Sequence, residues 1–202
     1  MVRRSFLTTA VMVLAALLAP KIPAAATDPA VMISKLGTRA LEVLGKDATQ
    51  SQRVERFHEL LKADFDVPGI ARFVLGRYWN IATEEQRAEF TKLFENYIAM
   101  AYATRLSEYS GETFKVVGSR PNADGAIVSS QIIRPTGAAP VKVDWRLTGR
   151  GGTYKIADVS VDGISMAVTQ RSEFASVIQH HGGQVQGLLA MLREKTAGSA
   201  AR

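Results

Sequence analysis

Four short segments in the second half of the chain constrain its fold more than any other feature. Each has the residue pattern of a β-strand and ends in turn-forming residues: 113–119 before PNADG, 126–134 before PTG, 141–148 before GRGG, and 154–161 before DG. Loops this short join antiparallel neighbours. The segments therefore predict a meander of four strands.

The third segment alternates without interruption between apolar and polar side chains. Successive side chains point to opposite faces of a strand. The two sets are Val141, Val143, Trp145 and Leu147, against Lys142, Asp144, Arg146 and Thr148. This sheet is expected to have one apolar and one hydrated face. If Asp144, Arg146 and Asp158 share the hydrated face, they could form cross-strand pairs.

Helical patterns lie on both sides of the strands. Helices are expected to open at Asp28-Pro29, at Ser51 and at 66–68, the last ending near Gly76. Residues 73–109 read as one long helix, entered through a capping box of Thr83 and Gln86. Two more helices follow the strands, at about 165–180 and after Gly182-Gly183. This order predicts an α+β class, with helices packed on one face of a curved four-stranded antiparallel sheet.

The apolar and aromatic stripe of the long helix is wider than the core of such a domain needs. Combined with the apolar sheet face, it predicts an apolar cavity between the helices and the sheet. Ordinary core packing is the alternative for any single residue in these walls. The expected sheet wall is Val141, Val143, Trp145 and Leu147, extended by Val116, Val128, Ile132 and Val159. The expected helical wall is Phe94, Ile98 and Tyr102.

Residues 1–26 have the pattern of a signal peptide. Arg3 and Arg4 precede an apolar run at 6–19, and AAA at 24–26 offers the small residues of a cleavage site before Thr27. The paired arginines fit either the Sec or the twin-arginine route, and an uncleaved anchor is a further alternative. We expect a periplasmic protein with a single domain over 27–196 and a disordered tail over 197–202.

Charge and composition exclude several functions. The leader holds three of the 25 basic residues and none of the 19 acidic ones, so the remainder is only mildly basic. The basic residues are scattered, which speaks against nucleic acid and is compatible with an anionic membrane surface. The chain has no cysteine, so it forms no disulfide. It also lacks the phosphate-binding motif of ATPases.

One serine has the sequence context of a catalytic nucleophile. Ser165, in GISMA, sits at a strand-to-helix turn like a nucleophile elbow, but with alanine in place of the last glycine. His180 and His181 end the helix that Ser165 begins, about 22 Å away, which leaves His58 as a base. Adjacent histidines on a helix do not face each other. We therefore expect Ser165 to cap its helix and the protein to have no catalytic site, metal or cofactor. Arg171 is expected at the surface or in an ion pair, with a position near the mouth of the pocket as the alternative.

The chain resembles the MlaC family of periplasmic phospholipid shuttles, also called toluene-tolerance proteins. The resemblance runs through about 27–193, and the loops and the tail depart from it. It is carried by VLGRYW at 74–79, ATEEQRAEF at 82–90, the segment 94–102, VDWRL at 143–147, YKIADV at 154–159 and DGISM at 162–166.

This resemblance implies a monomeric lipid carrier. Its implied partners are an outer-membrane lipoprotein–porin complex and an inner-membrane ABC transporter with an MCE-domain subunit. The family places acyl chains between the helices and the sheet. A hopanoid or another polycyclic lipid is an alternative cargo. An NTF2-like cavity enzyme and a structural adaptor are alternatives of other classes.

A carrier of this kind must hide a large apolar surface. A two-chain lipid has about 30 methylenes, whose exposure to water costs roughly 24 kcal/mol. The chains need about 800–1,000 Å³, at the upper end of ordinary ligand pockets. Contacts with methylenes are non-directional, so few polar residues are required.

Overall fold

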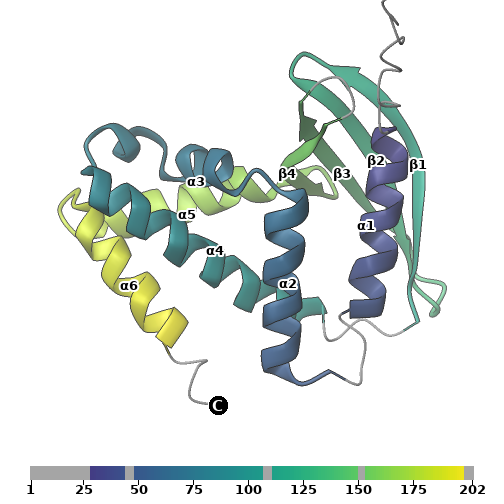
Figure 1. Cartoon of the computed structure of the whole chain (residues 1–202), viewed down its shortest axis with the longest axis horizontal. Coiled ribbons are helices and arrows are strands. Elements are labelled where there is room, and N and C mark those ends of the chain that lie inside the picture. Colours follow the sequence, from purple (N-terminus) through teal and green to yellow (C-terminus); the bar gives the residue numbers. More distant parts are fainter. Residues whose placement is uncertain (1–27, 44–47, 107–110, 150–152, 198–202) are drawn as a thin grey trace, which may run out of the picture.

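The fold is α+β, with six helices packed against an open antiparallel sheet (Figure 1). The computed structural model describes residues 28–43, 48–106, 111–149 and 153–197. The expected signal peptide and residues 198–202 of the expected tail lie outside this part. The helices are α1 (Pro29–Val43), α2 (Gln50–Asp64), α3 (Val67–Leu75), the 3-10 helix η1 (Gly76–Asn80), α4 (Glu84–Leu106), α5 (Met166–His180) and α6 (Val185–Ala197). The strands are β1 (Thr113–Asn122), β2 (Gly125–Ile133), β3 (Val141–Thr148), β4 (Lys155–Val161) and β5 (Ile164–Ser165).

Most helix ends follow the predicted capping chemistry. The Thr83 hydroxyl accepts from the Gln86 N–H at 3.2 Å, and the Gln86 side chain accepts from the Thr83 N–H at 3.1 Å, so the predicted capping box is present. Helix α2 begins one residue before the predicted start, because Thr49 forms a capping box of its own. The prediction of a single helix over 73–109 is wrong. Gly76, at a φ of 58°, ends α3, and η1 separates it from α4.

The sheet has five strands in the order β1-β2-β3-β4-β5, one more than predicted. The additional strand β5 has two residues and pairs with the end of β4. Asp162 and Gly163 connect them with positive φ angles of 48° and 84°, the geometry of a two-residue hairpin. The four predicted strands agree with the structure to within a few residues at their ends.

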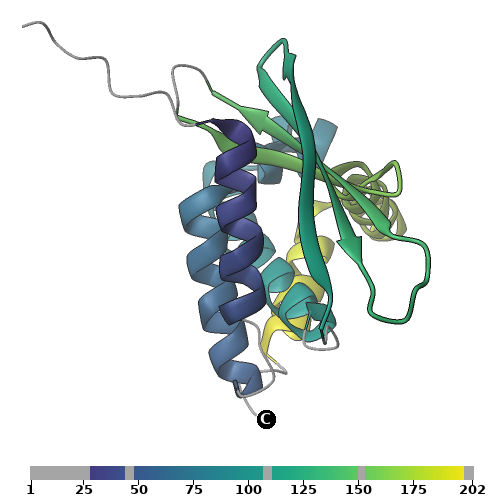
Figure 2. The same ribbon diagram turned by 90° about the vertical axis from the view of Figure 1, so that its right-hand side faces the viewer.

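Of the three clusters of buried apolar side chains in the part of the chain that the structure describes, two are large. Residues of α1, α2 and the sheet form the first: Ile33, Leu36, Leu60, Ala126, Val128, Leu147 and Ile156. The second joins α3, η1, α4, α5 and α6, with Phe90, Phe94, Phe174, Ile178, Leu188, Leu189 and Leu192 among its buried members. In Figure 1, α2 lies between the sheet with α1 on one side and helices α3, α5 and α6 on the other. Figure 2 shows α1 and α2 side by side along the sheet.

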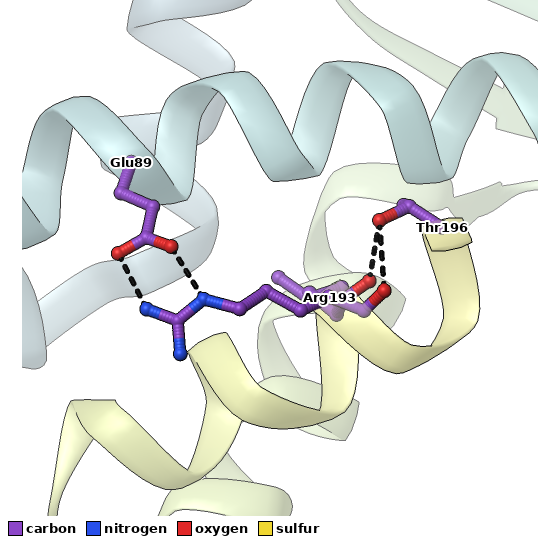
Figure 3. Close-up of polar contacts among 4 residues, drawn as sticks. Glu89, Arg193 and Thr196 are labelled. Atoms are coloured by element: carbon purple, nitrogen blue, oxygen red, sulfur yellow. Dashed lines mark hydrogen bonds and ion pairs between the residues drawn. The ribbon is translucent and has the colours of Figure 1, made fainter.

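A bidentate ion pair connects α6 to α4 at the surface of the second cluster. The Arg193 guanidinium donates to the two carboxylate oxygens of Glu89 at 2.6 and 2.8 Å (Figure 3). This contact holds the pKa of Glu89 below its ordinary value. One turn further on, the Thr196 hydroxyl donates to the Leu192 carbonyl at 2.8 Å.

Candidate functional site

All eight residues of the predicted sheet wall lie on one face of the sheet. Directly paired residues on neighbouring strands share a face. Trp145 pairs with Val128 on β2 and with Val159 on β4. The remaining pairs are Val143 with Ser130, Val141 with Ile132, Leu147 with Ala126, and Val116 with Ser130. The alternation of β3 therefore extends across four strands.

This apolar face is buried at one end and partly exposed at the other. Val128 and Leu147 are fully covered, together with Ile33 and Leu36 of α1. Val143 is also buried. The other wall residues keep part of their surface in contact with solvent: Val116, Ile132, Val141, Trp145 and Val159. Helix α1 lies across β1 and β2, whereas α3 and α5 reach the sheet at β4.

The indole of Trp145 is fixed at the centre of the face by a polar contact. Its Nε1–H donates to the Ser130 hydroxyl at 2.8 Å, and that hydroxyl donates to the Val143 carbonyl at 3.1 Å. The Phe114 ring meets the indole edge to face, with centroids 6.2 Å apart. Sequence reasoning missed Ser130 as a wall residue. The sequence pattern that could have indicated Ser130 is its position between Val128 and Ile132, on the apolar face of β2.

The three residues of the predicted helical wall do not lie together. Phe94 is buried in the second cluster, against Phe90 and Phe174 at centroid distances of 5.8 and 6.2 Å. Tyr102 stacks on Phe57 of α2 at 6.3 Å. The cause is helix geometry, since each step of four residues turns the side chain by about 40°. Phe94 and Tyr102 are two such steps apart, so their side chains point in different directions. Phe94 therefore meets α5, whereas Tyr102 meets α2.

The other two residues of the predicted helical wall, Ile98 and Tyr102, lie where α4 meets α2. Ile98 is partly exposed and packs beside both the second cluster and the contact between α2 and α4. Tyr102 is also partly exposed, and burial raises the pKa of its hydroxyl. The Arg105 guanidinium lies 5.5 Å from the centre of its ring.

Two pockets lie along α2 and α4. One, of about 340 Å³, is bounded by α2, α4 and α6 and includes Val54, Leu93 and Met100. The other, of about 560 Å³, includes His58, Lys62 and Glu95. Neither contains a residue of the sheet, so neither corresponds to the predicted cavity. That cavity remains a prediction.

Ser165 serves as a helix cap, as predicted. Its hydroxyl accepts from the Val168 N–H at 3.1 Å and donates to the Asp158 carboxylate at 2.6 Å. The same carboxylate accepts from the Ala167 N–H at 3.1 Å. Asp158 pairs with Arg146 across the strands, but the Arg146 guanidinium donates to the Ala157 carbonyl at 3.3 Å. Asp144 accepts from the Ser129 hydroxyl at 2.6 Å.

The histidines lie apart from Ser165. The Nδ1 atoms of His180 and His181 are each 2.8 Å from a carbonyl of the preceding turn of α5, at the far end of the helix. His58 Nδ1 lies 3.2 Å from Glu95 Oε1, between α2 and α4. Within the described ranges, no three His, Asp or Glu residues are grouped so that they could hold a metal ion. Likewise, none of the helices described is both long enough and apolar enough to span a bilayer.

The fold and the site together define an α+β protein in which an open sheet turns a partly exposed apolar wall toward its helices. The chain belongs to the MlaC protein family, whose model matches residues 35–194.

Individual relatives agree with this assignment. The chain is 27% identical over 113 residues to the intermembrane phospholipid transport system binding protein MlaC of Haemophilus influenzae, covering 54% of this chain and 53% of that one. It is 27% identical over 134 residues to the toluene tolerance protein Ttg2D of Pseudomonas putida, covering 65% of this chain and 61% of that one. The matches thus span about half to three fifths of these relatives.

A solved structure has the same fold. The phospholipid-binding protein of Ralstonia solanacearum, solved in complex with a phospholipid, superposes with a TM-score of 0.71. The match covers 86% of this chain and 99% of that protein, at 24% identity. This similarity places the five-stranded sheet and its helices in a known architecture.

Proposed function

We propose that this chain is a periplasmic lipid-transfer protein that carries phospholipid between the outer and inner membranes. One observation carries the proposal: the apolar face of the sheet stays partly exposed at Val116, Ile132, Val141, Trp145 and Val159. A tryptophan and four aliphatic side chains on one sheet face thus keep surface that an acyl chain could contact. Binding of acyl chains would remove that surface from water at about 25 cal/mol per Å².

Burial in the structure divides the predicted wall into two groups. A residue that contacts cargo needs free surface before the cargo arrives. We therefore assign lipid contact to the partly exposed members: Ile98, Tyr102, Val116, Ile132, Val141, Trp145 and Val159. The buried members support them from behind: Phe94, Val128, Val143 and Leu147.

The relatives support this function and suggest its setting. One is named as the binding protein of an intermembrane phospholipid transport system, and the solved neighbour holds a phospholipid. In the proposed setting the protein is a monomeric soluble component of an ABC-type, MCE-linked system. It receives lipid from, or delivers it to, the outer-membrane lipoprotein–porin complex. The polar contacts of Ser165, His180 and His181 are those of helix ends, and His58 contacts Glu95 between α2 and α4.

The two tryptophans of the chain make a direct test possible. Trp145 lies in the proposed wall, whereas Trp79 packs in the second cluster with the Arg87 guanidinium 5.6 Å from its ring. Trp79→Phe leaves Trp145 as the fluorophore, and Trp145→Phe is the matched control. Each variant is titrated with a phospholipid that carries bromine, a short-range quencher, on its acyl chain.

We expect strong quenching in Trp79→Phe and little in Trp145→Phe. Equal quenching in both, or none in either, would refute the proposed site. Mass spectrometry of lipid extracted from the purified protein then identifies the cargo, and a hopanoid or another polycyclic lipid would replace phospholipid in the proposal. Protein that is empty and also takes no lipid from vesicles would refute the carrier function.

A further inference from the structure

The proposed lipid wall continues into an exposed apolar surface at the β4–β5 hairpin. Val161 at the end of β4 pairs with Val143 of the wall on one side and with Ile164 of β5 on the other. Directly paired residues share a face, so Ile164 extends the same apolar face to its edge. Ile164 is 61% exposed there. The open end of the wall therefore lies at this hairpin.

Two further apolar side chains are exposed next to this edge. Val168, in the first turn of α5, is 51% exposed, and Phe73 on the adjoining α3 is 37% exposed. The Arg171 guanidinium, one turn after Val168, lies 5.1 Å from the centre of the Phe73 ring, which joins the two helices at the surface. We call Phe73, Ile164 and Val168, with Arg72 and Arg171, the α3–α5 patch.

The patch is positively charged. Arg72 and Arg171 are both exposed, and neither α3 nor residues 163–172 contain an acidic residue. Four nearby carboxylates accept hydrogen bonds, and one of them, Asp158, accepts from the Ser165 hydroxyl and the Ala167 N–H. Asp66 accepts from the Gly69 N–H, Asp162 from the Lys142 N–H, and Glu173 from the Gln170 side chain. Exposed apolar side chains beside unpaired positive charge are complementary to a surface that is anionic outside and apolar beneath.

We infer that the α3–α5 patch docks the protein on the surface of an anionic bilayer, with the open end of the wall toward the lipid. A bilayer accepts projecting apolar side chains without a matching groove, and its phosphates attract arginine. Docking at this edge gives an acyl chain a path from the membrane to Val161 and Trp145 along one continuous apolar face. The inference rests on the proposed function for that last step only, since docking itself does not require cargo.

Vesicle flotation tests the docking. Purified full-length mature protein is mixed with vesicles of pure phosphatidylcholine or with vesicles that contain phosphatidylglycerol. The variants are the double change Ile164→Ser with Val168→Ser, and Arg171→Gln. The matched control is Val117→Ser on β1, because Val117 is 59% exposed but lies outside the patch. Circular dichroism melting confirms that each variant is folded.

Binding to the anionic vesicles is expected to be at least tenfold stronger than to phosphatidylcholine and to fall as salt rises. The double serine variant should bind about tenfold more weakly, and Arg171→Gln about fivefold. Val117→Ser should bind like the wild type. No binding by the wild type, or equal binding by all variants, overturns the inference. A patch that then proves to bind only a protein would be a protein interface instead.

The two proposals can fail independently. Docking without quenching of Trp145 by brominated lipid would leave the patch as a membrane site and refute the cargo wall. Quenching without docking would leave the wall intact and refute the patch.

Discussion

Val128 and Val159 flank Trp145 on the same sheet face but should differ sharply when truncated to alanine. Val128 is fully buried beneath α1, whereas Val159 is partly exposed. Each change removes two methyl groups. At about 0.8 kcal/mol per buried carbon, plus a cavity term, Val128→Ala should lower the free energy of unfolding by about 2–3 kcal/mol. For Val159→Ala, where the site already opens to solvent, we expect a loss below about 1 kcal/mol.

Lipid affinity should show the opposite order. If Val159 contacts an acyl chain, its truncation removes about 0.5–1 kcal/mol of contact, which is a two- to fivefold weaker affinity. Val128→Ala should leave the affinity nearly unchanged. Urea unfolding of delipidated protein measures stability, with the slope checking for two-state behaviour. Quenching of Trp145 in the Trp79→Phe background measures affinity. Equal destabilisation, or a larger affinity loss for Val128→Ala, would refute the division of the wall into supporting and contacting residues.

Three further predictions test other parts of the structure. Val143→Glu places a charge at a buried position and should prevent stable folding, whereas Trp145→Glu should fold and lose lipid, as measured by thermal melting and lipid extraction. Gly37→Ala should destabilise, because its Cβ would meet the Phe114 ring, while Gly118→Ala, whose added Cβ meets nothing within 4 Å, should be nearly neutral in the same melts. Because Arg193 lowers the pKa of Glu89, their contact stabilises the fold above the ordinary carboxyl pKa and is lost as pH falls through the lowered one. The small difference in melting temperature between wild type and Glu89→Gln should therefore shrink as the pH falls below the ordinary carboxyl pKa and vanish below the lowered one, and a difference that grows on acidification would contradict this.

The sheet could be read from the sequence because its two faces meet different environments. The alternation over 141–148 survives in the structure residue for residue, and its register carries Val116, Val128, Ile132 and Val159 to the same face. Strand β5 was not predicted, because two residues are too few to show the alternation of apolar and polar side chains that marks a strand. Its signal was Asp162-Gly163, a dipeptide typical of two-residue hairpins, which was read as a plain turn into a helix.

The helical wall was harder to predict, because the broad apolar stripe of α4 does not show which other element each of its side chains contacts. Phe94 and Tyr102 lie two steps of four residues apart, yet one packs against Phe174 and the other against Phe57. The choice depends on where α2, α5 and α6 lie, and those positions are set by contacts distant in the sequence. The role of the buried Ser130 hydroxyl could likewise not be predicted, because it depends on a hydrogen bond from Trp145 on the next strand.

The division of the sheet face between burial and exposure has a thermodynamic consequence for a carrier. A wall that was buried throughout would stabilise the empty protein and leave no free surface for cargo. A wall exposed throughout would leave the sheet without a core, since Ile33 and Leu36 of α1 would have nothing to cover. In the arrangement observed, Val128, Leu147 and Ile156 hold the sheet to the helices whether or not lipid is present. Lipid that binds the open part then adds stability in proportion to its concentration over its dissociation constant. The melting temperature of the intact protein should therefore rise with added lipid even though the packing of α1 on the sheet does not change.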